Sequence, residues 1–459
     1  MKILLIQPPL NPNIIGAGIA YLTEPLALEV IASSVPNHYI SILDMRIDSN
    51  LEQKLKNFNP DIVGITGCTT DVYKIQEISI KVKEFNKNIL IVIGGHHATM
   101  VPEDFNKEYV DVVVIGEGEV TFKELVVAFE KKVKLSNIDG IAFRNGSNSL
   151  KYTKPREVMK NMDDMPFPNR NLTLKYRNKY FRGTWRPIAS IMSSKGCPFR
   201  CNFCSLWKIN NGKYFVRSPE SVVNEIQSIQ EKFIDFAEDN ALHDIPRVNK
   251  IYELIKQRDI KKTYKLYARS DTIVRHPDII EKWRSIGMDL VLVGLESYKD
   301  DELKGLNKSN TIKNNEEAVR ILHKNGVEIA AYFIVNPNYT KDDFEGLAAY
   351  VHKLNLKQPI FTVLTPLPGT DFYKQKYNEL TTKNYQLYDF VHTVLPTKLP
   401  LAEFYDNLLN LYNKFYLTEN NTIKKDGKLL TSNKILQQIH NLLSQAQKAE
   451  LNNKEGIVL

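Results

Sequence analysis

Short apolar runs alternate with helical patterns through the first third of the chain, and this alternation constrains the fold more than any other feature. The runs are rich in β-branched residues and continuously apolar, as expected for strands buried on both faces of a parallel sheet. They cover residues 3–7, 39–43, 62–66, 89–93 and 112–115, and helical patterns cover 26–35, 71–85 and 121–131. Such alternation predicts a doubly wound α/β domain, with a ligand at the carboxyl ends of the strands.

Glycines gather where three of these strands end, at Gly64-Ile65-Thr66-Gly67, Gly94-Gly95 and Gly116-Glu117-Gly118. Each glycine alone fits a tight turn, but together they let a large ligand contact bare backbone. Gly16 and Gly18 invite a dinucleotide fingerprint, which has to open a helix directly after the first strand. Three prolines precede Gly16, and Tyr21 stands where the third glycine belongs. The sequence therefore favours a different ligand.

Three of the four cysteines, Cys197, Cys201 and Cys204, fall within eight residues, and Cys68 lies apart in the first domain. Such a cluster indicates metal or redox chemistry rather than a disulfide framework. The three positions also share one face of a helix, but Gly196 and Pro198 argue against a regular helix there. Three thiolates are one fewer than a closed four-cysteine site needs, so we expect a cluster with one open iron.

The pattern Cys-x₃-Cys-x₂-Cys, with aromatic Phe203 before the third cysteine, resembles the signature of radical S-adenosylmethionine (radical SAM) enzymes. The resemblance implies a 4Fe-4S cluster held by Cys197, Cys201 and Cys204. Its open iron would chelate the amino and carboxylate groups of S-adenosylmethionine. It also implies an external electron donor of the flavodoxin or ferredoxin type.

A second series of strand-like runs surrounds and follows the cysteines, at 188–194, 233–237, 265–268, 290–293, 327–335 and 359–364. Helical segments at 219–232, 248–257, 277–286 and 314–325 alternate with them. This predicts a partial (β/α)₆ barrel with its chemistry at the carboxyl ends of the strands. Polar residues follow three of the strands, namely Glu238-Asp239-Asn240, Arg269-Ser270-Asp271 and Glu296-Ser297.

By resemblance, Glu238, Asp239 and Asn240 lie where the superfamily positions the methionine amino group. Glu296 lies at the position from which the superfamily contacts the adenosyl ribose, and Arg269 would meet a carboxylate. For Arg269 and Glu296, a salt bridge within the barrel mouth is the alternative.

The strand-end glycines, together with Gln7-Pro8-Pro9, resemble the cobalamin-binding domain that precedes many radical SAM domains. Thr66 matches the serine or threonine beside the cobalamin tail, and Gly94-Gly95 matches the double glycine. The resemblance implies that the cofactor-binding residues are Thr66, Gly94, Gly95, Gly116, Glu117 and Gly118. No Asp-x-His-x-x-Gly follows the first strand, so we expect no histidine ligand to cobalt from that loop.

The predicted organisation is α/β throughout. A Rossmann-like cobalamin-binding domain (1–140), a linker (141–185) and the radical SAM barrel (186–400) precede a helical C-terminal region (401–459), with an amphipathic helix at 435–443. That region reads as a packing appendage or as a cap over the substrate. No apolar run reaches the roughly 20 residues of a membrane span, and the first run reads as a strand rather than a signal peptide. We therefore expect a cytoplasmic protein.

The excess of 61 basic over 53 acidic residues gives a net charge of +8. Because no basic stripe or aromatic-interleaved basic patch appears, we expect no nucleic-acid partner.

Three local strings resemble one branch of the cobalamin-dependent radical SAM methyltransferases, the hopanoid C-3 methylases. They lie at 204–208, at 267–277 and at 392–400. The resemblance implies methylation of an unactivated carbon, on a small-molecule substrate that is lipid-like or a natural product. One S-adenosylmethionine would methylate cobalamin, and a second would yield the 5′-deoxyadenosyl radical that removes a substrate hydrogen. Peripheral contact with a membrane stays open.

Three alternative functions have to be weighed against this one. The same cofactors would serve ring formation or rearrangement without methyl transfer. Methylthiolation needs a second cysteine set, which four cysteines cannot supply. A non-catalytic cobalamin or redox sensor would have no use for an open iron.

Overall fold

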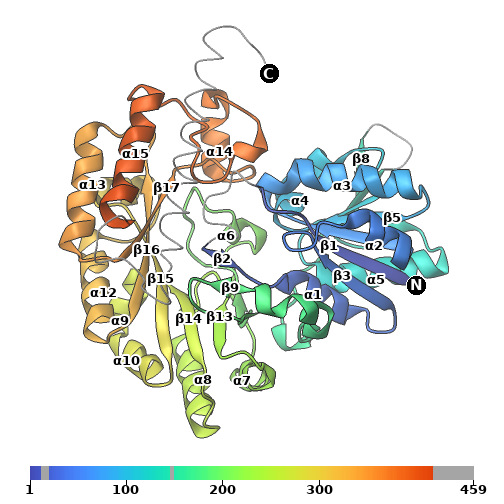
Figure 1. Ribbon diagram of the computed structural model, residues 1–459, viewed down its shortest axis with the longest axis horizontal. Helices are drawn as coiled ribbons and strands as arrows, with labels where there is room; N and C mark the ends of the chain where they lie inside the picture. The colour runs from blue at the N-terminus through green and yellow to red at the C-terminus, as the bar shows by residue number, and fades with distance from the viewer. Residues whose placement is uncertain (12–19, 145–148, 417–459) are drawn as a thin grey trace.

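The computed structural model describes residues 1–11, 20–144 and 149–416 and shows two sheets in two lobes (Figure 1). The first sheet has the order β3-β1-β4-β5-β6-β7-β8. Its first five strands are parallel, and β7 and β8 add an antiparallel edge. The strands are β1 (Lys2–Gln7), β3 (Tyr39–Asp44), β4 (Ile62–Thr66), β5 (Leu90–Gly94), β6 (Val112–Val114), β7 (Ile141–Arg144) and β8 (Leu150–Tyr152).

Helices cover both faces of this sheet, as the continuous apolar strands predicted. Helices α1 (Leu26–Ser34) and α5 (Gly118–Lys131) bury Leu28 and Phe122 against one face. Helices α2 (Leu51–Phe58) and α3 (Val72–Phe85) bury Leu55 and Ile75 against the other. The parallel order is that of a flavodoxin-like domain, whose ligand site lies beyond the carboxyl ends of the strands. The short helix α4 (His96–Met100) follows β5 at that edge.

The second sheet has six parallel strands in the order β10-β13-β14-β15-β16-β17, which confirms the predicted partial barrel. The strands are β10 (Ile188–Ile191), β13 (Phe233–Phe236), β14 (Thr263–Ala268), β15 (Met288–Glu296), β16 (Glu328–Val335) and β17 (Gln358–Val363). Its helices are α7 (Pro219–Ser228), α8 (Ile245–Gln257), α9 (Ser270–Arg275), α10 (Pro277–Ser285), α11 (Asp300–Gly305), α12 (Ile312–Lys324), α13 (Lys341–Lys353), α14 (Asp371–Lys376) and α15 (Leu401–Tyr416).

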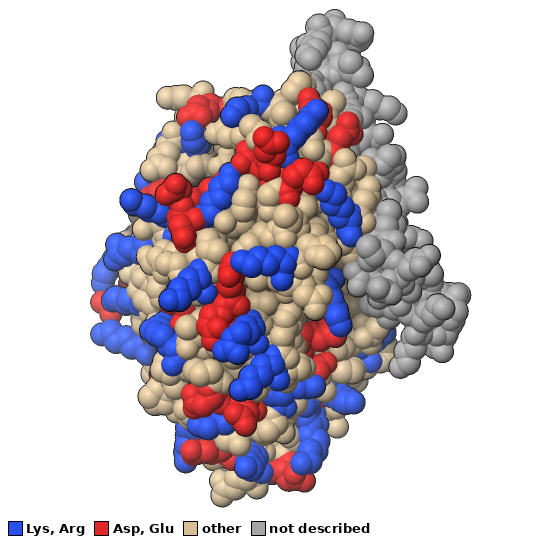
Figure 2. All heavy atoms as spheres, turned by 90° about the vertical axis from the view of Figure 1, so that its left-hand side faces the viewer, with Lys and Arg blue, Asp and Glu red and all other residues tan. Residues whose placement is uncertain are grey.

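Local capping explains where several of these helices begin. The side chains of Ser218, Asp244 and Thr311 accept hydrogen bonds from backbone N–H groups in the first turns of α7, α8 and α12. Thr340 and Asp343 form a capping box at the start of α13. On the outer face shown in Figure 2, Lys and Arg side chains lie among Asp and Glu side chains, as on a solvated helical surface.

Helix α15 packs on the barrel beside α13 and β17, with Phe404, Leu408 and Tyr412 in the main apolar core. The first part of the predicted helical C-terminal region therefore packs as an appendage. The predicted amphipathic helix at 435–443 lies outside the described residues. None of the described helices combines the length and the apolar character that crossing a bilayer requires.

The described residues of the segment predicted as a linker form regular elements and pack against both lobes. Its first part forms β7 and β8, so the predicted boundary at residue 140 falls inside the first sheet. The reason is that β7 pairs with β6 and buries Ile141, Ala142 and Phe143. Further along, a 3₁₀ segment at Arg170–Lys179 leads into β9 (Phe181–Arg182), which pairs with β2 (Tyr21–Leu22) between the two lobes (Figure 1).

Buried ion pairs join this segment to both lobes. Glu24 and Glu29 are buried at the start of α1. Arg177 forms an ion pair with Glu24, and Arg170 lies 2.8 Å from Glu225 of α7. The Glu24 carboxylate also accepts a hydrogen bond from the backbone N–H of Ser190 in β10 at 2.5 Å. The two lobes are therefore fixed to each other through buried charges as well as apolar contacts.

Candidate radical and cobalamin site

The cysteine segment is an irregular loop that follows the two-residue strand β11 (Ser194–Lys195), so the helical alternative for the cysteines is wrong. Gly196 has a φ of +84°, and a Cβ there would lie 2.2 Å from the carbonyl oxygen of Lys213. Only glycine fits such a position. The loop begins beside β12 (Phe215–Val216), which pairs with β11.

Two carboxylates after β13 hold the start of this loop. Glu238 accepts hydrogen bonds from the Ser193 N–H at 2.9 Å and from the Ser194 hydroxyl. Asp239 accepts one from the Gly196 N–H at 2.8 Å. Burial raises the pKa of both carboxyl groups. The sequence placed these two residues at the site, and the structure shows that they also fix the loop.

The rest of the loop is anchored by the barrel. Asn202 donates from its backbone N–H to Leu306 O at 3.1 Å and from its side chain to Gly305 O at 2.8 Å. The Asn307 side chain donates back to Arg200 O at 2.7 Å. Phe203 packs against a cluster formed by Leu306, Ile334, Leu364, Phe372 and Leu395. These anchors hold an irregular backbone where a cluster-binding loop is required.

The donor set fits an open 4Fe-4S cluster. Among the described residues, no three His, Cys, Asp or Glu side chains converge on a single metal ion. A cubane does not need this, because each of its thiolate ligands binds a different iron. Burial raises the pKa of all three thiols, that of Cys204 to about 12, so they stay protonated until a metal replaces the proton. Cys197, Cys201 and Cys204 would hold the cluster.

Asn240 supplies a buried polar group with unused hydrogen bonds. The side chain is 0% exposed, and within the described residues neither its amide oxygen nor its amide nitrogen has a hydrogen-bond partner. Such a group is costly unless a ligand pairs with it. It lies directly after the two loop-holding carboxylates, and its donor and acceptor suit the amino and carboxylate groups of S-adenosylmethionine.

Arg269 and Glu296 are both engaged within the barrel mouth. The Arg269 guanidinium lies 3.5 Å over the Phe199 ring and donates to Asp271 at 2.8 Å and to Lys308 O at 2.9 Å. Glu296 accepts a hydrogen bond from Lys308 Nζ at 2.6 Å. The alternative predicted for these residues, salt bridges in the barrel mouth, is therefore present. Their contacts with S-adenosylmethionine stay predictions.

Lys308 is a residue that sequence reasoning missed. Its partner Glu296 has a φ of +63° beside a register shift between β15 and β16. A Cβ at Gly294 would lie 2.2 Å from the Glu296 carboxylate. This strained backbone turns Glu296 toward Lys308, and no periodicity or spacing signals it.

At the carboxyl edge of the first sheet, the glycines leave open space. A Cβ at Gly116 would meet no atom within 4 Å, and one at Gly94 would meet only Val114 at 3.8 Å. Gly95, with a φ of +104°, lies against Thr66, where a Cβ would be 2.6 Å from the hydroxyl. This cradle fits the face of a large flat cofactor. Gly118 packs closely on α1, because a Cβ there would meet Ile31 at 2.8 Å, and its contact with a cofactor stays a prediction.

The two carboxyl edges face each other across direct contacts. His96 of α4 lies 2.7 Å from the Ser205 hydroxyl, one residue past the third cysteine. Glu117 forms an ion pair with Lys195 at the start of the cysteine loop, and it accepts a hydrogen bond from the Met159 N–H at 2.7 Å. The neighbouring His97 is buried and bonded to Thr69 and Asp104 at 3.1 and 2.9 Å, as a structural histidine.

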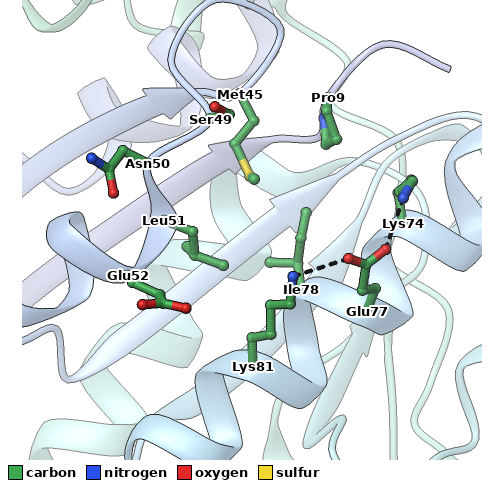
Figure 3. A pocket seen from close by; sticks show the side chains of 10 residues that line it. All are labelled: Pro9, Met45, Ser49, Asn50, Leu51, Glu52, Lys74, Glu77, Ile78 and Lys81. Atoms are coloured by element: carbon green, nitrogen blue, oxygen red, sulfur yellow. Dashed lines mark hydrogen bonds and ion pairs between the residues drawn. The ribbon is translucent and has the colours of Figure 1, made fainter. Parts of the chain in front are cut away.

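A further pocket of about 250 Å³ lies in the first lobe (Figure 3). It is formed by α2, α3 and the loops after β1 and β3, with lining residues Pro9, Met45, Ser49, Asn50, Leu51, Glu52, Lys74, Glu77, Ile78 and Lys81. It includes Pro9 of the Gln7-Pro8-Pro9 string but none of the cysteine-loop or strand-end glycine residues.

Comparison with known proteins agrees with this geometry. The radical SAM superfamily matches residues 191–351, and the B12-binding domain matches residues 12–126. The hopanoid C-3 methylase of Methylococcus capsulatus is 30% identical over 86% of this chain and 76% of its own. An uncharacterised methyltransferase of Pyrococcus horikoshii is 30% identical over 92% and 94%. This chain belongs to the cobalamin-dependent radical SAM methyltransferase family.

Ring-forming enzymes are also similar to the chain. An anaerobic magnesium-protoporphyrin IX monomethyl ester cyclase of Rubrivivax gelatinosus is 26% identical over 91% of this chain and 78% of its own. The fold matches that of the methyltransferase TsrM from Kitasatospora setae, solved with cobalamin and a [4Fe-4S] cluster. The TM-score is 0.71 at 16% identity, covering 98% of this chain and 99% of the other. The cofactors of the present protein are therefore a 4Fe-4S cluster, S-adenosylmethionine and cobalamin.

Proposed function

We propose that the protein methylates an unactivated carbon of a lipid-like or natural-product substrate. The observation that carries this proposal is the direct apposition of the cysteine loop and the glycine cradle, joined by the His96–Ser205 and Glu117–Lys195 contacts. When bound, the cluster with S-adenosylmethionine supplies a source of carbon radicals, and cobalamin supplies a methyl group. A substrate between the two edges would reach both.

The chain's own residues would do the positioning. Glu238 and Asp239 fix the backbone from Ser193 to Gly196, which sets where the first cysteine lies. Asn240 would bind the methionine end of S-adenosylmethionine through its free amide. On the opposite side, Gly94 and Gly116 would let the cobalamin ring contact backbone, because neither has a side chain to hold it away. Thr66 would lie beside the cofactor tail.

Support for a lipid-like substrate comes from the 30% identical hopanoid C-3 methylase. A flavodoxin- or ferredoxin-type electron donor and peripheral contact with a membrane remain part of the proposal. The rival function, ring formation or rearrangement without methyl transfer, is kept because a cyclase is also similar over most of the chain.

The test is anaerobic reconstitution with cobalamin and methyl-labelled S-adenosylmethionine, followed by incubation with lipid and polar extracts. We expect a labelled product, with 5′-deoxyadenosine and S-adenosylhomocysteine formed in equal amounts. Product that forms without 5′-deoxyadenosine would contradict radical methylation, and a changed product without label would establish the rival. Cys201→Ala should abolish cluster absorbance and 5′-deoxyadenosine formation. Cys68→Ala, the fourth cysteine, should leave the cluster absorbance unchanged.

A further inference from the structure

Tyrosines and charged side chains gather inside the barrel, apart from the cysteine loop. Tyr267 of β14 and Tyr332 of β16 are partly buried against Leu290, Leu292, Ala330, Trp185 and Ile360, a cluster distinct from the main core. Within the described residues, neither tyrosine hydroxyl has a hydrogen-bond partner. This inner face therefore combines an apolar surface with polar groups that the protein leaves unused.

The β2–β9 ladder adds two residues to this inner face. Tyr21 pairs with Arg182 across the ladder, and the guanidinium lies 5.2 Å from the centre of the Tyr21 ring. Burial raises the pKa of Tyr332 to about 12, with Arg182 and Tyr21 among the ionisable neighbours that act on it. The ladder therefore lies close to the barrel tyrosines, although it comes from the N-terminal segment and the connection between the lobes.

The constellation extends between the two cofactor regions. Tyr21 is near Cys68, in the turn directly after Thr66 and the glycine cradle. Tyr332 is near Glu296, which is itself close enough to act on Cys201 of the cysteine loop. A molecule bound against these tyrosines would lie where the proposed reaction needs its substrate.

Asp235 faces two cationic side chains inside the barrel. Asp235 of β13 forms a close ion pair with Lys265 of β14, which is 0% exposed and lies 3.7 Å from the centre of the Tyr267 ring. The other oxygen of Asp235 lies 3.9 Å from Arg182 Nε, too far for a hydrogen bond. Two cations thus share one carboxylate. Two further carboxylates lie nearby but are already engaged. Glu238 is near Lys265 and accepts hydrogen bonds from Ser193 and Ser194, and Glu296 pairs with Lys308.

The Arg182 Nε atom is buried and has no hydrogen-bond partner among the described residues. Residues 12–19, which lead into β2, contain no carboxylate. A buried guanidinium N–H without a hydrogen-bond partner is costly, and the planar fork binds a carboxylate or a phosphate through paired hydrogen bonds. A ligand that carries such a group would remove this cost.

We infer that Tyr21, Tyr267, Tyr332 and Arg182 form the substrate site, and that the substrate is an apolar molecule bearing one anionic group, a carboxylate or a phosphate. The inference rests on the proposed function and narrows it, because a wholly neutral polycyclic lipid would leave the buried Nε of Arg182 without a hydrogen-bonded anion. The apolar body would contact the tyrosine rings, and the anion would bind Arg182.

Three fluorescent probes test this with the anaerobically reconstituted holoenzyme: pyrenebutyrate, its neutral methyl ester and pyrenebutyl phosphate. We expect at least one anionic probe to bind about tenfold more tightly than the ester, as expected for one charge-assisted hydrogen-bonded contact. The preferred anion distinguishes carboxylate from phosphate. Equal binding of all three probes, or binding of none, would overturn the inference.

Variants separate a lost charge from a damaged fold. Arg182→Gln should bring the ratio of the ester's dissociation constant to that of the anionic probe close to one. Arg182→Lys should restore part of this ratio. Lys179→Gln, which removes an exposed charge three residues away, should behave as the wild type. Tyr332→Ala should weaken all probes alike. If Arg182→Gln keeps the preference, Arg182 does not bind the anion.

Failure of the inference and failure of the proposed function give different results. The probe preference is measured without turnover, so its absence together with labelled methyl transfer would overturn the anionic substrate alone. A clear preference together with an unlabelled, rearranged product would keep the anionic site and overturn methyl transfer.

Discussion

The two halves of the site are built in opposite ways. The cradle at the first sheet is defined by missing side chains, since Gly94 and Gly116 face open space. The cysteine loop is defined by attachments, since Glu238, Asp239 and the 305–307 segment all hold its backbone. A large preformed cofactor needs room, whereas a cluster assembled on three thiols needs those thiols held in place. A substitution in one half should therefore abolish binding of that half's cofactor and leave binding of the other cofactor intact.

Gly196→Ala should have the largest effect. Its Cβ would lie 2.2 Å from the Lys213 carbonyl at a φ of +84°, so the loop has to move and the cluster should be lost. We expect iron content and 5′-deoxyadenosine formation to fall to background while cobalamin still binds. Gly326→Ala is the matched control, because it has a φ of +64° with no atom within 4 Å and should cost only about 1–2 kcal/mol of stability.

Gly94→Val should cause the converse loss. Its Cβ would touch only Val114 at 3.8 Å, so the fold tolerates it while the added methyl groups occupy the cradle. Cobalamin retained after gel filtration should fall at least about tenfold, the equivalent of roughly 1.4 kcal/mol, with Gly94→Ala intermediate. Cluster absorbance should stay at the wild-type level. Loss of both cofactors would show that the halves are not independent.

Sequence reasoning located both halves because each has a local signature. Apolar runs marked the parallel strands, and the cysteine spacing marked the loop. It missed the β2–β9 and β11–β12 ladders, since strands of two residues have no period. It also took the packed segment after residue 140 for a linker, because polar and proline-containing stretches resemble one until their tertiary partners are known.

The roles of individual side chains were harder to predict than their location. Glu238, Asp239 and Asn240 were expected together at the methionine amino group. The structure shows that the first two also hold the loop backbone, while Asn240 carries the unused hydrogen bonds. The pairing of Glu296 with Lys308 depends on a left-handed backbone and a register shift. Both depend on tertiary geometry, which no spacing encodes.

Asp239→Ala should weaken the cysteine loop without removing it. The Gly196 N–H would lose its acceptor in a buried setting, at a cost of about 1–3 kcal/mol. We expect severalfold lower cluster occupancy and 5′-deoxyadenosine formation, measured as iron per chain and by chromatography. Asp239→Asn retains an acceptor oxygen and should restore most of the occupancy. If Asn is as poor as Ala, the negative charge rather than the hydrogen bond holds the loop.

The smallest expected effect concerns the buried charged residues that join the two lobes. Burial raises the pKa of Glu29 from 4.5 to about 8, and repulsion from the neighbouring Glu24 carboxylate adds to this shift. A carboxyl group whose pKa is raised on folding stabilises the protein fully below its unfolded pKa, and this stability is lost as the pH rises to the folded pKa. The free energy of unfolding should therefore decrease between pH 4.5 and about 8.

Glu29→Gln should remove that slope, because a neutral amide has no charge to bury. We expect it to stabilise the protein clearly at pH 8 and to change its stability little at pH 5, measured by urea unfolding. Glu130→Gln, a carboxylate on α5 for which no such burial applies, is the control. An unchanged slope in Glu29→Gln would mean that Arg170 and Arg177 keep Glu29 ionised. The lobes would then be joined by an ion-pair network at every pH in this range.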